Sequence, residues 1–300
     1  MIPQSIRRSL LHLVILSSQG LASDWLALYN SGEEKLRHGM AEEAARDLRQ
    51  SLRSAESDKV SPAQLAGILD ALGRSRFRAG KYREATGYFE KALQLAHQPG
   101  SRLAGLVNAS QAYRELGEYK KSEHYIREAL RMAPGDARHW QLLGSVLIKS
   151  RKYEEAQLAE QKALALGDAS VAALAWSDLS AMAEAQGHLT EAATLLERAI
   201  HTMHPQHARG RLLVSLAALE MRAKHPHPAA SHLREAIQDL ETALGKMHPD
   251  LAKALDFYAS VLRRVGRKSE ARQAAERAGE IRASLAATVH WRDLKPPAQD

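Results

Sequence analysis

One phrase of thirteen residues recurs along this chain, and no other feature restricts its fold as strongly. The letters KYREATGYFEKAL begin at Lys81, EYKKSEHYIREAL at Glu118 and KYEEAQLAEQKAL at Lys152. A period of 34 to 41 residues is typical of a stacked array, because each unit is too small to bury its apolar face alone and packs it against its neighbours. Aligned on one small residue, the pattern occupies seven positions: Ala44, Ala85, Ser122, Ala156, Ala192, Ala230 and Ala271.

Each unit contains a turn between two helical patterns. Most units carry a glycine five residues before the aligned position, and glycine readily takes a positive φ where one helix ends and the next begins. Arg151 and His225 stand at the corresponding places in the fourth and sixth units. The glycines are Gly39, Gly80, Gly117, Gly187 and Gly266.

The two helical patterns of a unit have complementary shapes. Before the turn, a large and a small residue stand four apart on one helical face, and the small residue lets a second helix approach closely. After the turn, apolar residues such as Phe89 lie four positions past the aligned residue and face back. No stretch alternates as a strand does, so the pattern predicts an all-α fold. The large and small pairs include Leu69 with Gly73, Trp140 with Gly144, and Val214 with Ala218.

The units resemble tetratricopeptide repeats, whose pattern begins W-x2-L-G-x2-Y. The fourth unit follows that pattern at Trp140, Leu143, Gly144, Ala156 and Ala163. The resemblance implies a right-handed α-solenoid of about seven antiparallel helix-pair repeats. The segment LGKMHPDLAKAL, Leu244 to Leu255, is similar to the longer repeats of kinesin light chains and related bacterial proteins.

We expect residues 23–285 to form this solenoid, and residues 286–300, which are polar and rich in proline, to form a disordered tail. The approximate units are 25–58, 66–99, 103–136, 137–170, 173–206, 208–243 and 250–285.

Residues 1–22 have the layout of a secretory signal peptide. Two arginines precede an apolar run from Leu10 to Leu16, and small residues lead to a cleavage site after Ala22. The run is too short to cross a bilayer, so we expect no stable membrane span. The alternative is that Ile6 to Ser18 forms an amphipathic helix that covers the first repeat.

No set of residues in the sequence points to catalysis. The chain has no cysteine and carries no phosphate-binding glycine loop, nucleophile elbow or metalloprotease motif. His201, His204 and His207 are spaced by three, but Pro205 interrupts the helix that would align them on a metal. We therefore expect a protein that is not an enzyme and that holds no cofactor and no metal.

The resemblance implies that the first helix of each pair lines the concave side, where a ligand would bind. In units two to four, a polar stripe on that side could hold an extended peptide through hydrogen bonds to its main chain and carboxylates. The stripe consists of Asp70, Arg74, Gln111, Arg138 and Gln141. The carboxylate-clamp variety is not expected, since only Asn108 and Arg138 match its residues and Asp70 stands where a lysine would be needed. The candidate binding residues are Tyr29, Asp70, Arg74, Asn108, Gln111, Arg138, Gln141 and Ser145.

The leading hypothesis is a non-enzymatic scaffold, exported to the periplasm or beyond, that binds a peptide or protein segment in its groove. One alternative is a cytoplasmic sensory or assembly module that acts through a partner in trans. Another is a nucleic-acid binder, suggested by the net charge of +7 and by the basic residues between Arg263 and Arg272. Acids and bases alternate along the chain, which argues against nucleic acid.

Overall fold

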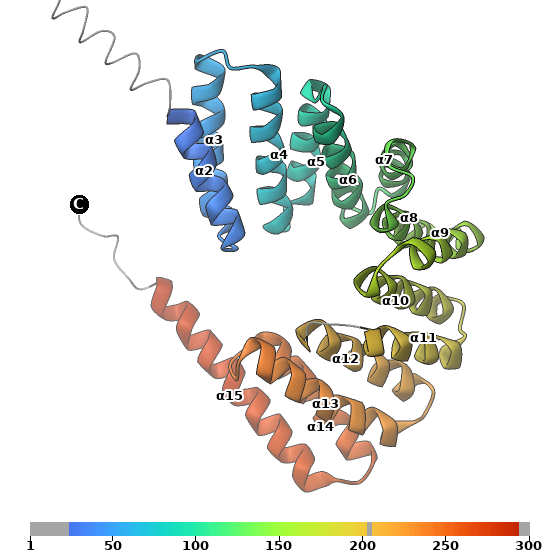
Figure 1. Cartoon of the computed structure of the whole chain (residues 1–300). Coiled ribbons are helices and arrows are strands. Elements are labelled where there is room, and N and C mark those ends of the chain that lie inside the picture. The colour runs from blue at the N-terminus through green and yellow to red at the C-terminus, as the bar shows by residue number, and fades with distance from the viewer. Residues whose placement is uncertain (1–23, 203–205, 294–300) are drawn as a thin grey trace, which may run out of the picture. The chain divides into compact units, whose positions relative to one another are not determined.

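The computed structural model describes residues 24–202 and 206–293, and every regular element in these ranges is an α-helix. The predicted all-α fold is confirmed. The chain divides into two compact units, which we call the N-terminal unit (residues 1–150) and the C-terminal unit (residues 151–300). Within each unit, helices that follow one another in sequence pack together as antiparallel pairs (Figure 1).

The described helices alternate along the chain as first and second members of these pairs. The N-terminal unit contains α2 (Asp24–Arg37), α3 (Ala41–Ser57), α4 (Pro62–Arg78), α5 (Tyr82–Leu95), α6 (Pro99–Glu115), α7 (Tyr119–Met132) and α8 (Ala137–Lys149). The C-terminal unit contains α9 (Tyr153–Leu166), α10 (Ala169–Ala185), α11 (Leu189–Thr202), α12 (Gln206–Arg222), α13 (Pro226–Leu244), α14 (Pro249–Arg264) and α15 (Lys268–Asp293).

The turns inside the pairs depend on one residue in the left-handed conformation. Gly80 has a φ of +72°, and its N–H donates to the carbonyl of Phe77 at 3.0 Å, while the N–H of Lys81 donates to the carbonyl of Arg76 at 2.9 Å. These two bonds occupy carbonyls that the end of α4 leaves without helical partners. All five predicted glycines have a positive φ, and in the fourth unit Arg151 takes it, at 61°.

The sixth unit departs by one residue from the predicted alignment. Lys224, rather than His225, has the positive φ, at 64°. Pro226 begins α13, and the residue before a proline is held in extended conformations, so His225 cannot serve as the left-handed residue. Lys224 and His225 then make the same two bonds as at the glycine turns, to the carbonyls of Met221 and Glu220.

This shift changes which residues of the sixth unit face the core. The prediction of Val214 with Ala218, aligned on Ala230, is wrong by one position, because Ala218 is exposed. The residues that hold the core positions are all at most 2% exposed: Leu213, Ala217, Ala229 and Leu233.

Small residues let the paired helices come close. A Cβ built on Gly73 of α4 would lie 2.4 Å from Cε1 of Phe89 on α5, which is too close for two carbon atoms that are not bonded to each other. Where serine replaces glycine, its hydroxyl bonds the facing backbone: Ser110 Oγ donates to the carbonyl of Ser122 at 3.0 Å. Each close contact therefore buries an apolar side chain such as Phe89, worth about 1.5–3 kcal/mol.

The C-terminal boundary lies later than predicted. Helix α15 continues to Asp293, so residues 286–293 are helical and the prediction of a disordered tail is wrong for them. The segment opens with Ala286 and Ala287 and contains neither glycine nor proline, so nothing local ends the helix. The predicted signal peptide, the alternative helix over Ile6 to Ser18, and residues 294–300 lie outside the described residues.

A buried acid occupies one of the core positions. Glu160 on α9 is fully buried at the place where Leu48, Phe89, Ile126 and Leu196 stand in other units. Within the described part of the chain, its two carboxylate oxygens are bonded to no cation and no backbone donor, and the polar group beside them is the carboxyl of Asp178. Burial, and next the negative charge of Asp178 on α10, raise the pKa of Glu160 to about 10. The side chain is therefore a neutral acid at pH 7.

Raising the pH should weaken the folded state through Glu160. The pKa of Glu160 is about 10 in the folded chain and 4.5 ordinarily. Between these two pH values, which we call the window, the folded chain keeps a proton that the unfolded chain has lost. The free energy of unfolding should fall across the window by at most ~1.4 kcal/mol per pH unit. Glu160→Gln is neutral at every pH and should remove this slope. Urea unfolding of both proteins between pH 5 and pH 9 measures it, and parallel pH profiles would contradict the expectation.

Candidate functional site

The eight predicted binding residues all lie in the N-terminal unit, on the first helices of its pairs. Tyr29 is on α2, Asp70 and Arg74 are on α4, Asn108 and Gln111 are on α6, and Arg138, Gln141 and Ser145 are on α8. All except Arg138 and Ser145 are half-buried; Arg138 is exposed and Ser145 is buried.

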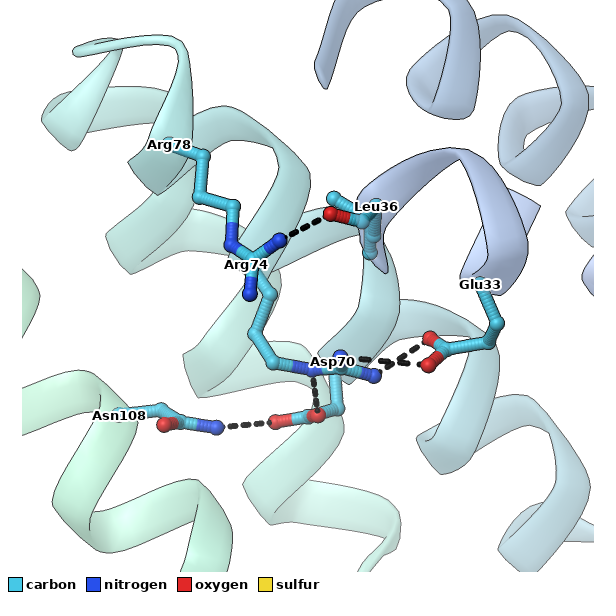
Figure 2. A network of polar contacts seen from close by, with 6 residues as sticks. All are labelled: Glu33, Leu36, Asp70, Arg74, Arg78 and Asn108. Carbon is cyan, nitrogen blue, oxygen red and sulfur yellow. Dashed lines mark hydrogen bonds and ion pairs between the residues drawn. The ribbon is translucent and has the colours of Figure 1, made fainter. Parts of the chain in front are cut away.

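A polar network connects three of these helices around Arg74 (Figure 2). The Arg74 Nη2 atom lies 2.5 Å from Glu33 Oε1 on α2, and its Nε donates to Asp70 Oδ2 at 2.9 Å. Asn108 on α6 donates from Nδ2 to Asp70 Oδ1 at 2.8 Å. Arg78 adds a bond from Nη1 to the carbonyl of Leu36. Residues far apart in sequence thus form one rigid surface across α2, α4 and α6.

The network holds Arg74 in its charged form between two acids. Burial alone would lower the pKa of Arg74, but its hydrogen bonds to Glu33 and the charge of Asp70 raise it, so the guanidinium stays charged. The combined negative charge of Glu33 and Asp70 exceeds the positive charge of Arg74 by one. Arg78, which donates to a backbone carbonyl of α2 rather than to either acid, balances the network as a whole. The pKa of Tyr29 is raised, first by its burial and then by Glu33, with Arg74 opposing, which agrees with a negative balance beside the phenol.

A second group of contacts joins α6 to α8. Arg114 Nη1 donates to Ser145 Oγ at 3.2 Å, and Arg114 Nη2 donates to Glu115 Oε1 at 2.8 Å. Sequence reasoning missed Arg114 and Glu115. They lie one helical turn beyond Gln111, and extending the predicted face of α6 by that turn finds them.

A hollow of about 170 Å³ lies among the first helices α2, α4 and α6 and the second helix α5 of the N-terminal unit. Tyr29 of α2 and Asp70 of α4 line it together, so the structure brings two of the predicted residues to one site. Gly67 of α4 and Ser101 and Gly105 of α6 also line it, and four alanines, which lie on α4, on α5, directly after α5 and on α6, complete its walls. The site therefore combines a small apolar cavity with one edge of the polar network.

The described ranges contain no candidate metal site and no candidate membrane span. No group of three or more histidine, aspartate or glutamate side chains placed to hold a metal ion occurs there. His204 and the side chain of His207 lie outside them, so the predicted absence of a histidine site stays a prediction. None of the described helices is long and apolar enough to span a membrane.

Two family models, both described as tetratricopeptide repeat, match the sequence. One matches residues 64–135, and the other matches residues 107–171 and 142–208. No curated protein matches the sequence significantly.

Solved structures share the fold at low sequence identity. A tetratricopeptide repeat protein from Parabacteroides merdae is 18% identical, with a TM-score of 0.61 over 86% of this chain and 93% of its own. The apo form of RapI is 12% identical, with a TM-score of 0.62 over 88% and 99%. PilW, a type IV pilus biogenesis factor, is 21% identical, with a TM-score of 0.52 over 76% and 95%. These likenesses support a solenoid of helix pairs.

Arg74→Gln should destabilise the N-terminal unit, because it leaves Glu33 and Asp70 partly buried and close together without their shared cation. We expect a loss of about 1–3 kcal/mol in the free energy of unfolding. Arg46→Gln is the matched control, since Arg46 is 69% exposed and lies 3.8 Å from Glu43, and should cost less than ~0.5 kcal/mol. Urea unfolding measures both, and equal losses would show that the network is not structural.

Proposed function

Because the chain is a tetratricopeptide repeat protein, a class of scaffold for protein–protein interaction, we propose that it binds a peptide or protein segment along α2, α4, α6 and α8. The observation that carries the proposal is the polar surface that these first helices share. Glu33, Asp70, Arg74 and Asn108 hold one another in place there, beside a hollow of about 170 Å³. We propose no catalytic step.

The arrangement suits binding because its polar groups are already ordered. Side chains that bind only after they become fixed lose rotamer entropy, about 0.5–1.5 kcal/mol each, and the hydrogen bonds around Arg74 have already removed that freedom. The carboxylates still have lone pairs for donors of a bound segment. Arg138, exposed at the start of α8, adds a positive charge further along the same set of helices.

Nucleic acid is less well supported as a ligand. In the basic stretch between Arg263 and Arg272, Arg267 donates to both carboxylate oxygens of Glu270, and Arg272 Nε lies 2.7 Å from Glu276. Cations paired in this way release fewer counterions on binding phosphate, so a strong salt-dependent affinity is not expected.

Photocrosslinking tests whether the first-helix surface binds a partner. With p-benzoylphenylalanine in place of Arg138 on α8, irradiation in the native host should produce a major adduct of defined mass. The same substitution at Lys120, which is exposed on the second helix α7, is the matched control and should produce little of it. Equal adducts from the two positions, or none from position 138, would count against this surface.

We also propose that the chain is exported, which rests on the layout of residues 1–22. Cleavage after Ala22 would produce a mature protein that begins at Ser23. N-terminal sequencing of protein from an extracytoplasmic fraction should therefore start at Ser23. An intact Met1 in the cytoplasm would instead favour the module that acts through a partner in trans.

A further inference from the structure

The hollow beside Asp70 has a definite chemical character. Its walls are mostly the small side chains of alanine and the backbone of glycine, and the hydroxyl-bearing residues Tyr29 and Ser101 also line it. Of the described residues that line it, Asp70 alone is charged. A Cβ built on Gly67 would meet nothing within 4 Å, so the hollow is open above that residue. A ligand group that fits must combine a narrow apolar stem with a polar end that suits a carboxylate.

The charges around the hollow favour a cation. Asp70 and Glu33 carry two negative charges, and Arg74 is paired with both of them. Arg78, the second cation of the network, donates to a backbone carbonyl of α2 and does not line the hollow. The Nε, Nη1 and Nη2 atoms of Arg74 already donate to those two acids, so Arg74 is poorly placed to receive a carboxylate. Asp70 accepts one bond at each oxygen, from Asn108 and from Arg74, and a carboxylate oxygen has a second acceptor site.

We propose that the hollow takes a lysine side chain of the bound segment, with its methylene stem against the alanines and glycines and its ammonium against Asp70. This inference rests on the proposed function and names the chemistry of the partner. An ammonium is a compact charge that needs one oxygen at a time, whereas a guanidinium fork needs both oxygens of a carboxylate side by side. Both oxygens of Asp70 already hold a donor, so lysine fits better than arginine.

The probe is n-butylammonium, which is the lysine side chain without its backbone. It is titrated into the full chain, labelled with ²H and ¹⁵N, while the backbone amide NMR signals of Gly67 and Gly105 are followed. We expect both signals to shift and to saturate at millimolar concentrations. Three compounds serve as controls: butyrate carries the opposite charge, n-butanol carries no charge, and n-butylguanidinium carries the same charge on a planar, forked group. Equal affinity for any of the three would overturn the proposal.

Two variants separate charge from space. Asp70→Asn keeps the shape of the side chain and removes its charge, and should weaken n-butylammonium binding by about tenfold or more. Glu56→Gln removes the same charge from an exposed site on α3 and should leave binding unchanged. Gly67→Leu places a side chain where the hollow is open, improves helix propensity at that position, and should abolish the shift at Gly105.

The outcomes distinguish this proposal from the proposed function. The lysine site would be overturned if the Gly67→Leu protein still bound n-butylammonium. It would also be overturned if an Asp70→Asn protein with wild-type helicity bound n-butylammonium as tightly as the wild type does. An adduct from position 138 without any n-butylammonium shift would also overturn it, while the groove itself would stand as a binding surface. A captured segment whose crosslinking falls when its lysines become glutamine would support both.

Discussion

The close approach of the two helices in each pair is the constraint on which the structure depends. At Gly73 the backbone of α4 comes so near to Phe89 that a Cβ would clash, and Gly32 stands in the same relation to Leu48. Where serine takes this position, the hydroxyls of Ser110 and Ser122 donate to each other's backbone carbonyls, so both are buried without an unsatisfied hydrogen-bond donor. The pairs bury their apolar faces in this way, and in the N-terminal unit the first helices α4 and α6 carry the polar residues of the network around Arg74 on another face.

Because the first helices α4 and α6 each have one apolar and one polar face, the N-terminal unit has both a closely packed core and an ordered polar surface. The first helices are held by packing on one side, so Glu33, Asp70, Arg74 and Asn108 meet at fixed distances on the other. The sequence pattern assigns Arg74 to a ligand's carboxylate, but its Nε, Nη1 and Nη2 atoms all donate to Asp70 or Glu33. Beside Tyr29, whose pKa is raised first by burial and then by Glu33, the carboxylate of Asp70 lines the hollow, and the proposed ligand group is therefore a cation.

Packing also determines the charge of Glu160, which lies inside the core rather than at the surface. It stands at the core position where other units have a large apolar residue, and burial keeps it protonated. Its neighbour Asp178 lies on the next helix of the C-terminal unit and adds to the shift. A repeat pattern read from sequence assigns this position to the core but cannot show whether the side chain there reaches water, because that depends on the packing of α9 and α10.

The sequence by itself determined the helix pairs, the five glycine turns and the assignment of all eight candidate residues to first helices. These follow from local rules: the φ that glycine permits and the spacing that places residues on one helical face. The one-residue shift at Lys224 also has a local cause, since Pro226 excludes His225 from the left-handed conformation. The prediction that placed the turn at His225 did not take that proline into account. Only the tertiary structure decided that Arg74 is paired, that Arg114 reaches Ser145 and that a hollow lies beside Asp70. Those contacts join helices tens of residues apart, and their distances depend on packing that no single segment encodes.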